Sequence, residues 1–255
     1  MNLLFLIFLF IIGLHIGSFL NVLIDRLPKG KSILGRSRCD FCKKKLNWYD
    51  LVPVISFFIL KGKCRFCRKK LSFFYPFIEI LTAVLFVLSF KFIPTQSVEA
   101  KITFLVVVSV LIAIFFADMK YQIIPDSLQL AFLVFGMICL TFALSKLSLF
   151  DRFFGSLVVL APILIIFLIT KGRGMGFADV KLAGIIGFLF GIKGGAISLY
   201  IAFVIGAVFG LVLILFGIKK LKSKIAFGPF LVLGILANFF FQDLLNNLVF
   251  RLYGF

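Results

Sequence analysis

Residues 102–118 read ITFLVVVSVLIAIFFAD, an apolar run that carries no charge before its last residue, Asp118. A helix that crosses a lipid bilayer needs roughly 20 mostly apolar residues, so this run predicts a membrane-spanning helix with an acid at one end. Comparable apolar stretches recur along the chain, at residues 2–24, 74–93, 102–117, 127–145, 153–170, 180–192, 195–218 and 226–250. The sequence therefore predicts an all-α integral membrane protein with about eight transmembrane helices.

The composition supports this prediction and excludes a soluble globular protein. The 255 residues are 62% hydrophobic and only 15% charged, whereas soluble domains average about 45–50% apolar and about 25% charged residues. The 28 Lys and Arg residues against 10 Asp and Glu give a formal charge of +18. In a soluble protein this charge would suggest nucleic-acid binding. Here the bases lie between apolar stretches, so we expect the lipid bilayer, and no nucleic acid, as a partner.

The distribution of bases predicts the topology. From Arg26 to Lys70 lie 14 of the 28 bases and only two acids, Asp40 and Asp50. Because positively charged loops remain in the cytoplasm, this segment is expected there. The first apolar stretch has no basic residue before it, so it is interpreted as an anchor and not as a cleaved signal peptide. The predicted organisation is a first transmembrane helix, a small cytoplasmic insertion and a membrane core, at residues 1–25, 26–73 and 74–255.

The insertion contains four of the five cysteines, as two Cys-x-x-Cys pairs. Cys39 and Cys42 form the first pair, and Cys64 and Cys67 the second, within a short internal repeat of residues 38–46 and 63–71. Disulfides are rare in the reducing cytoplasm, and two such pairs can supply the four thiolates of a tetrahedral structural Zn²⁺ site. The alternative is four reduced thiols without a metal.

The second chemical signal is a small set of acids at the ends of apolar stretches: Asp118, Asp126 and Asp179. Carboxylates at membrane depth are costly and therefore mark functional sites. The topology places Asp118 and Asp179 at the same depth on the cytoplasmic side. Two carboxylates held close together share a proton, so one can act as a general base and the other as a general acid. This is the chemistry of an aspartyl protease, and His15, the only histidine, leaves little room for a histidine-based site.

Each acid also has a structural interpretation. Asp126 follows Pro125, which interrupts a helix, and an acid at the start of the next helix would stabilise its amino-terminal end. Asp179 could pair with Lys181 or with a helix terminus, and Asp118 could pair with a neighbouring lysine. Three glycines in residues 172–176 favour the catalytic interpretation of Asp179, because they permit an extended chain to approach closely.

Together, these motifs resemble the type IV prepilin peptidases, intramembrane aspartyl proteases of the GxGD type, over nearly the whole chain. The matching segments are Gly17-Ser-Phe-Leu-Asn-Val22, Arg26-Leu-Pro28, the cysteine loop through Tyr75-Pro76 to Glu79, Asp118 with Ile124-Pro-Asp126, Gly174-Met-Gly176-Phe-Ala-Asp179-Val-Lys181 and Phe227-Gly-Pro-Phe230. Two departures are Ala178 in the GxGD tetrad and Phe74, where the family usually has an arginine. The resemblance implies Asp118 and Asp179 as the catalytic residues.

The resemblance also implies the reaction and its place in the cell. These enzymes cleave the basic leader of prepilin or pseudopilin substrates at the cytoplasmic face of the bacterial inner membrane. Many also methylate the new amino terminus from S-adenosylmethionine, an activity associated with the cysteine loop. Glu79, beside this loop, is a weak candidate for orienting the amine or the cofactor, and the alternative is a buried acid paired with a loop base. Residues 26–73 contain no glycine-rich turn that would by itself indicate a cofactor.

Other functions remain compatible with the residues alone. The chain could be a leader peptidase without methyltransferase activity, or a non-enzymatic assembly factor whose zinc loop binds a partner. A transporter with an acidic proton relay is also possible, although the sequence shows no convincing internal repeat of the kind transporters have. Asparagine at the two aspartates distinguishes these functions, because an assembly factor needs neither acid.

Overall fold

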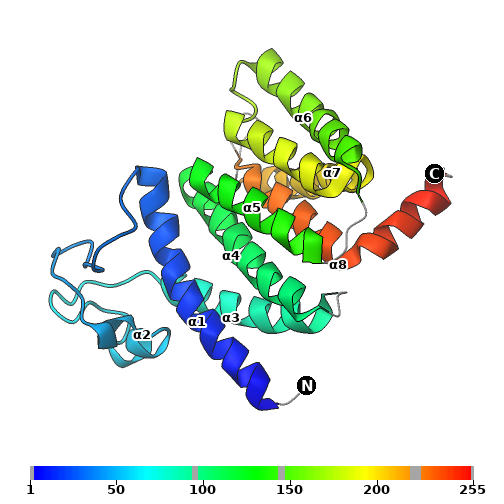
Figure 1. Ribbon diagram of the computed structural model, residues 1–255. Coiled ribbons are helices and arrows are strands. Elements are labelled where there is room, and N and C mark those ends of the chain that lie inside the picture. Colours follow the sequence, from blue (N-terminus) through cyan, green and yellow to red (C-terminus); the bar gives the residue numbers. More distant parts are fainter. Residues whose placement is uncertain (1–2, 94–96, 143–146, 219–224, 254–255) are drawn as a thin grey trace. The chain divides into compact units, whose positions relative to one another are not determined.

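The computed structural model describes residues 3–93, 97–142, 147–218 and 225–253, and these residues confirm the all-helical prediction (Figure 1). They contain eight α-helices and two short 3-10 helices: α1 (Leu3–Arg26), η1 (Leu27–Lys29), η2 (Trp48–Leu51), α2 (Ile55–Ile59), α3 (Phe74–Phe92), α4 (Val98–Tyr121), α5 (Asp126–Phe142), α6 (Leu149–Thr170), α7 (Phe177–Leu215) and α8 (Gly228–Tyr253). Residue 2 and residues 143–145 of the predicted membrane spans lie outside the described residues.

Within the described residues, five helices are long and apolar enough to cross a membrane: α1, α3, α4, α6 and α7. Helix α5 and the first part of α8, Gly228–Phe241, are apolar but shorter. Helix α7 covers the sixth predicted span and residues 195–215 of the seventh, and its backbone breaks at Gly191, near the end of the sixth span, where a φ of 70° and a ψ of −170° are not helical. The protein is therefore a multi-pass membrane protein.

Residues Met1–Phe92 form one compact unit. Its helices α1 and α3 run antiparallel and touch through two glycines of α1. A Cβ atom on Gly13 would lie 2.5 Å from the Cα of Ala83, and one on Gly17 would lie 2.6 Å from the Cα of Glu79. These contacts are the close glycine-mediated packing that is frequent in membrane helices. The loop between α1 and α3 carries the four cysteines.

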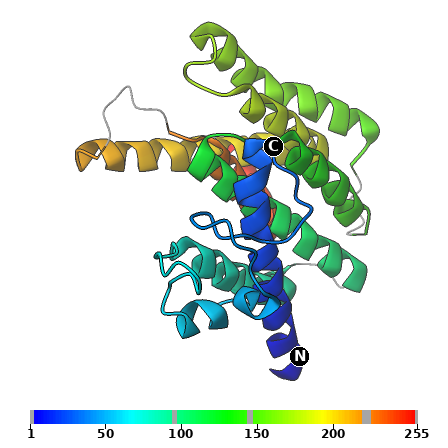
Figure 2. The same cartoon turned by 90° about the vertical axis from the view of Figure 1, so that its left-hand side faces the viewer.

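Residues Ile93–Phe255 form the second unit. Helix α4 is its most deeply buried helix and packs against α5 and α8, while α7 packs against α5, α6 and α8. Figures 1 and 2 show α4 beside α5 and α6 beside α7. The α6–α7 contact is very close, since a Cβ atom on Gly187 would lie 2.1 Å from the carbonyl oxygen of Gly155.

The break in α7 is bound by a buried arginine of α6. The Nη1 atom of Arg152 donates to the carbonyl oxygens of Phe188 at 3.4 Å and Leu189 at 3.2 Å. The last carbonyls before a helix end have no partner within the helix, so the guanidinium supplies one. The first half of α7, which begins two residues before Asp179, is thereby fixed at its opposite end.

Candidate functional site

Asp118 lies in the last turn of α4 and is buried, with 6% of its surface exposed. Its Oδ2 atom accepts a 2.9 Å hydrogen bond from the backbone N–H of Gly228, the first residue of α8. The approach requires a glycine, because a Cβ atom on residue 228 would lie 2.6 Å from Oδ2. The helix ends just beyond the acid, at Tyr121, and the next residue, Gln122, adopts a left-handed conformation with a φ of 54°.

Asp179 lies in the first turn of α7 and is also buried, with 7% exposed. Its Oδ2 atom accepts a 3.0 Å hydrogen bond from the backbone N–H of Gly176, immediately before the helix. This is one of the two structural interactions expected for Asp179, the one with the helix terminus. Its Oδ1 atom is buried and has no hydrogen-bond partner among the described residues. One oxygen of the carboxylate is therefore fixed, while the other has no partner in the part of the chain that the structure describes.

The structure brings these two acids together although 61 residues separate them in the sequence. The carboxylates of Asp118 and Asp179 are close enough to interact electrostatically. The end of α4, the start of α7 and the start of α8 meet at this point. Two buried carboxylates held in this way can share a proton and act as an acid and a base.

Asp126, the third acid, does not join this pair. It begins α5, as the sequence predicts, but its exposed carboxylate forms an ion pair with Lys181 of α7. Lys181 is thus bound to Asp126 and not to Asp179, the other partner that the sequence allowed. The ion pair links α5 to α7 two residues beyond Asp179.

The four cysteines of the loop form one cluster. Their Sγ atoms all lie within 4.8 Å of one another, and those of Cys39 and Cys67 are 3.8 Å apart. Two thiolates bound to a tetrahedral Zn²⁺ at about 2.3 Å are separated by about 3.8 Å. The cluster could therefore hold a metal ion, and its donor set fits zinc.

The two Cys-x-x-Cys turns are copies of each other, as the sequence repeat predicts. In the first turn, Cys39 N–H donates to Lys44 O at 3.0 Å and Lys43 N–H to Cys39 O at 2.9 Å. In the second, the equivalent bonds from Cys64 and Arg68 have the same lengths. Each turn also places a lysine over a phenylalanine ring of the other: Lys44 over Phe66 at 5.2 Å and Lys69 over Phe41 at 4.9 Å.

The thiols of this cluster differ in acidity. The backbone N–H of Cys67 lowers the pKa of the Cys64 thiol to about 7, while burial raises the pKa of the Cys39 thiol to about 11. Because metals bind thiolates, a metal ion must displace the proton of Cys39, and it meets a readily ionised thiol at Cys64.

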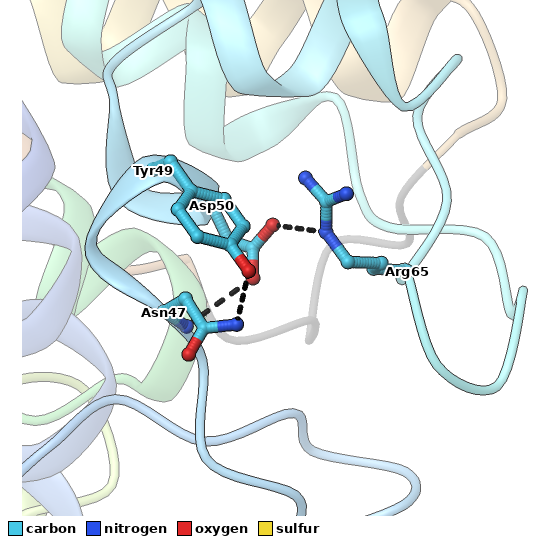
Figure 3. Close-up of polar contacts among 4 residues, drawn as sticks. All are labelled: Asn47, Tyr49, Asp50 and Arg65. Carbon is cyan, nitrogen blue, oxygen red and sulfur yellow. Dashed lines mark hydrogen bonds and ion pairs between the residues drawn. The ribbon is translucent and has the colours of Figure 1, made fainter.

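A polar network connects the segment between the turns to the second turn (Figure 3). Arg65 Nε donates to Oδ1 of Asp50 at 2.7 Å, and its guanidinium lies over the ring of Tyr49 at 4.8 Å. The other carboxylate oxygen of Asp50 accepts from the backbone N–H of Asn47 at 3.2 Å. These contacts fix η2 against the second turn.

A cavity of about 730 Å³ lies in the first unit, between the cysteine loop and helices α1 and α3. Asn21 and Glu79, which are both buried, line it. The Nδ2 atom of Asn21 donates to Tyr75 O at 3.1 Å, but its Oδ1 atom has no partner among the described residues. Such a volume is typical of small-molecule sites, and an unpartnered buried acceptor is a feature that a ligand can satisfy.

Glu79 is buried, as its alternative interpretation requires, but the partner shown for its carboxylate is a backbone N–H and not a loop base. Its Oε2 atom accepts a 2.7 Å hydrogen bond from the backbone N–H of Val54. Val54 has a φ of 60°, which is strained for a β-branched residue. Glu79 therefore fixes the loop at a strained point directly before α2.

Two residues of these sites are not singled out by the sequence analysis, namely Gly228 and Asn21. Both lie within segments that carry the family resemblance, Phe227-Gly-Pro-Phe230 and Gly17-Ser-Phe-Leu-Asn-Val22. That resemblance was the only available signal, since neither residue is ionisable.

Comparisons of the sequence with known proteins find two matching family models and several similar enzymes. Residues 11–93 match the bacterial peptidase A24 N-terminal domain, and residues 104–211 match the type IV leader peptidase family. The chain is 31% identical over 241 residues to the prepilin leader peptidase/N-methyltransferase of Bacillus subtilis (strain 168), covering 92% of this chain and 94% of that protein. It is 30% identical over 264 residues to the enzyme of the same name from Legionella pneumophila, covering 92% and 91%. No solved structure matches the chain.

Proposed function

The chain belongs to the type IV leader peptidase family, whose members include prepilin leader peptidase/N-methyltransferases, and from this premise we propose that Asp118 and Asp179 are its catalytic residues. The observation that carries the proposal is that both acids are buried and held together, each with one oxygen bound by a glycine N–H. The proposed substrates of this chain are prepilins or pseudopilins, which it cleaves between the basic leader and the apolar segment.

The proposed cleavage begins with one proton shared by the two carboxyl groups, so that one group is ionised and the other is protonated. The ionised carboxylate takes a proton from a water molecule, whose oxygen attacks the scissile carbonyl carbon. The protonated carboxyl group gives its proton to the leaving nitrogen as the C–N bond breaks. Gly228 and Gly176 orient the acids, and we assign the unpartnered Oδ1 atom of Asp179 to the contact with water.

We further propose that the chain crosses the membrane eight times, with the cysteine loop and both aspartates on the cytoplasmic side. The 14 bases from Arg26 to Lys70 support this orientation. The break at Gly191 supports counting α7 as two spans, because it divides the helix close to the boundary between the sixth and seventh apolar stretches. In this topology the domains are the first helix at residues 1–25, the loop at 26–73 and the protease core at 74–255.

The cysteine cluster is proposed to hold one structural Zn²⁺ through Cys39, Cys42, Cys64 and Cys67. All four positions around a tetrahedral ion would be taken by the protein, so the metal would add stability and no catalytic water. The ion would join the two turns, which the chain otherwise connects only by weaker contacts such as the reciprocal lysine–phenylalanine pairs.

The methyl donor S-adenosylmethionine is proposed to bind in the cavity of the first unit. The unpartnered Oδ1 atom of Asn21 fits the ammonium or adenine N–H groups of such a ligand, and Glu79 supplies negative charge. When bound, the sulfonium of the donor supplies a methyl group to an amine. The α-amino group freed by cleavage has a pKa near 7.7–8.0, so part of it is neutral and nucleophilic at pH 7 without a strong base.

The deciding experiment incubates the purified protein with a prepilin-like substrate and isotopically labelled S-adenosylmethionine. Amino-terminal sequencing should find a single cut after the leader, and mass spectrometry should find one labelled methyl group on the new terminus. Intact substrate would reject the peptidase proposal. Complete cleavage without label would reject the methyl-donor site and leave a leader peptidase alone.

A further inference from the structure

Helix α2, in the cysteine loop, presents an apolar face that none of the described residues of its own unit covers. Ile55, Phe58 and Ile59 are all exposed, Phe58 at 60%. Their spacing of three and four residues places them on one side of the helix. The opposite side is used differently, because Ser56, Phe57 and Leu60 line the cavity of this unit.

The position of α2 along α1 is fixed by two contacts. Val54, directly before α2, donates its N–H to Glu79 of α3, and Glu79 packs against Gly17 of α1. Helix α1 continues from Gly17 to Arg26, which is about 13 Å at 1.5 Å per residue. Measured along α1, helix α2 therefore begins well before the carboxyl-terminal end of α1. Helix α1 is apolar enough to cross the membrane.

The neighbouring helices expose apolar side chains at the same level. Phe19 of α1 and Ile80 of α3, each close in sequence to the Gly17–Glu79 contact, are both exposed large hydrophobic residues. A helix that crosses a bilayer presents such residues to lipid. The outer face of α2 thus lies at a depth where α1 and α3 also face acyl chains.

We infer that α2 is embedded in the bilayer at the boundary between headgroups and acyl chains, with Ile55, Phe58 and Ile59 in contact with lipid. The chain that follows α2 carries exposed bases, including Lys61 and Lys63. An apolar helical face next to bases is the pattern of interfacial helices that bind anionic membranes. The cysteine loop is therefore attached to the membrane between its two flanking helices and does not extend freely into the solvent.

The inference can be tested by tryptophan fluorescence, because Trp48 is the only tryptophan of the chain. In a W48F background, Phe58→Trp places the reporter on the outer face of α2. The matched control in the same background is Leu34→Trp. Leu34 belongs to the same loop and is 83% exposed, but its carbonyl accepts from Arg26, at the end of α1.

Both variants are reconstituted in vesicles of phosphatidylcholine and phosphatidylglycerol, with or without bromine on the acyl chains. The tryptophan at position 58 should emit at shorter wavelength than the one at position 34 and lose most of its intensity in brominated vesicles. Weak quenching at position 58, or equal quenching at both positions, would overturn the inference. So would quenching that disappears when a prepilin peptide is added or when the protein is diluted in lipid, since the face would then bind substrate or a second copy.

Discussion

Gly228 donates its backbone N–H to Oδ2 of Asp118, 110 residues earlier in the chain, across a distance of 2.9 Å. The contact places the start of α8 against the end of α4 and fixes one of the two proposed catalytic carboxylates. It also gives a physical role to the Phe227-Gly-Pro-Phe230 segment, which contains no ionisable group. A backbone donor in this position stabilises a carboxylate without adding a competing charge.

The first prediction concerns the space at Gly228. In Gly228→Ala the new Cβ would lie 2.6 Å from Oδ2 of Asp118, so the carboxylate must move. Because small misplacements of catalytic groups are costly, we expect cleavage to slow by roughly 100-fold. The control is Gly210→Ala, whose Cβ would make only an ordinary 3.8 Å contact with Ile225. Equal cleavage rates for the two variants would show that the Asp118 contact is not needed.

The second prediction concerns the aspartates themselves. Asparagine preserves the shape of the side chain but cannot exchange the proton, so Asp118→Asn and Asp179→Asn should each abolish cleavage while the protein still inserts into the membrane. Asp126→Asn should keep appreciable activity, because Asp126 is exposed and pairs with Lys181 outside the buried pair. Cleavage is measured on a prepilin-like substrate at matched protein levels. Full activity of either of the first two variants would reject the catalytic pair.

How far the sequence predicts this site depends on the kind of interaction. The proximity of Asp118 and Asp179 follows from topology, because both acids end apolar stretches on the same side. The partner of Lys181 does not follow, because several acids were available. Asp179 is nearer in sequence, but residues two apart on a helix point in different directions, and Asp126 meets Lys181 only through the packing of α5 on α7.

The fold shows the same limit at helix breaks. The sequence predicts separate spans at 180–192 and 195–218, and the structure has two helical segments within α7 that meet at the non-helical residue Gly191. Hydropathy locates the interruption closely, but it does not reveal whether the chain makes a loop or a single non-helical residue. The positive φ of Gly191 shows that a non-helical residue makes the interruption. Hydropathy also does not indicate Arg152, which belongs to a different helix and binds the carbonyl of Leu189 beside the break.

The third prediction concerns the metal. Elemental analysis of protein purified without chelators should find one zinc per chain, and Cys64→Ser should lose it, since the thiolate is the ligand. The helices should remain inserted, because α1 and α3 contact each other directly through Gly13 and Gly17. Cys139→Ser is the matched control: Cys139 is buried in α5 with its thiol 3.7 Å from Ala100 O, outside the cluster. Zinc retained by the Cys64 variant would remove that residue from the metal site.

The fourth prediction separates the two activities. Glu79→Gln keeps an oxygen that can accept from the N–H of Val54 but removes the charge from the cavity. We expect methyl transfer to fall while leader cleavage continues, because the aspartates lie in the other unit. Asn21→Ala should act in the same direction by removing the unpartnered acceptor. Labelled methyl incorporation on pre-cleaved substrate measures the effect, and unchanged incorporation in both variants would place the methyl donor elsewhere.

The last prediction concerns Arg152, the buried base of α6. Its guanidinium binds the carbonyls of Phe188 and Leu189 at the end of the first half of α7, and Asp179 lies in the first turn of that half-helix. Arg152→Met keeps an apolar side chain of similar reach but leaves these carbonyls without the guanidinium. An unsatisfied buried polar group costs about 1–3 kcal/mol, so the unfolding temperature in detergent should fall and cleavage should weaken.

Arg152→Lys can still donate to one carbonyl, so its unfolding temperature and its cleavage rate should lie between those of Arg152→Met and the wild type. Arg251→Met removes an exposed base from the last turn of α8 and should change neither property. If Arg152→Met unfolds at the wild-type temperature, the guanidinium does not hold the broken helix, and the position of Asp179 must depend on the α6–α7 glycine contacts instead.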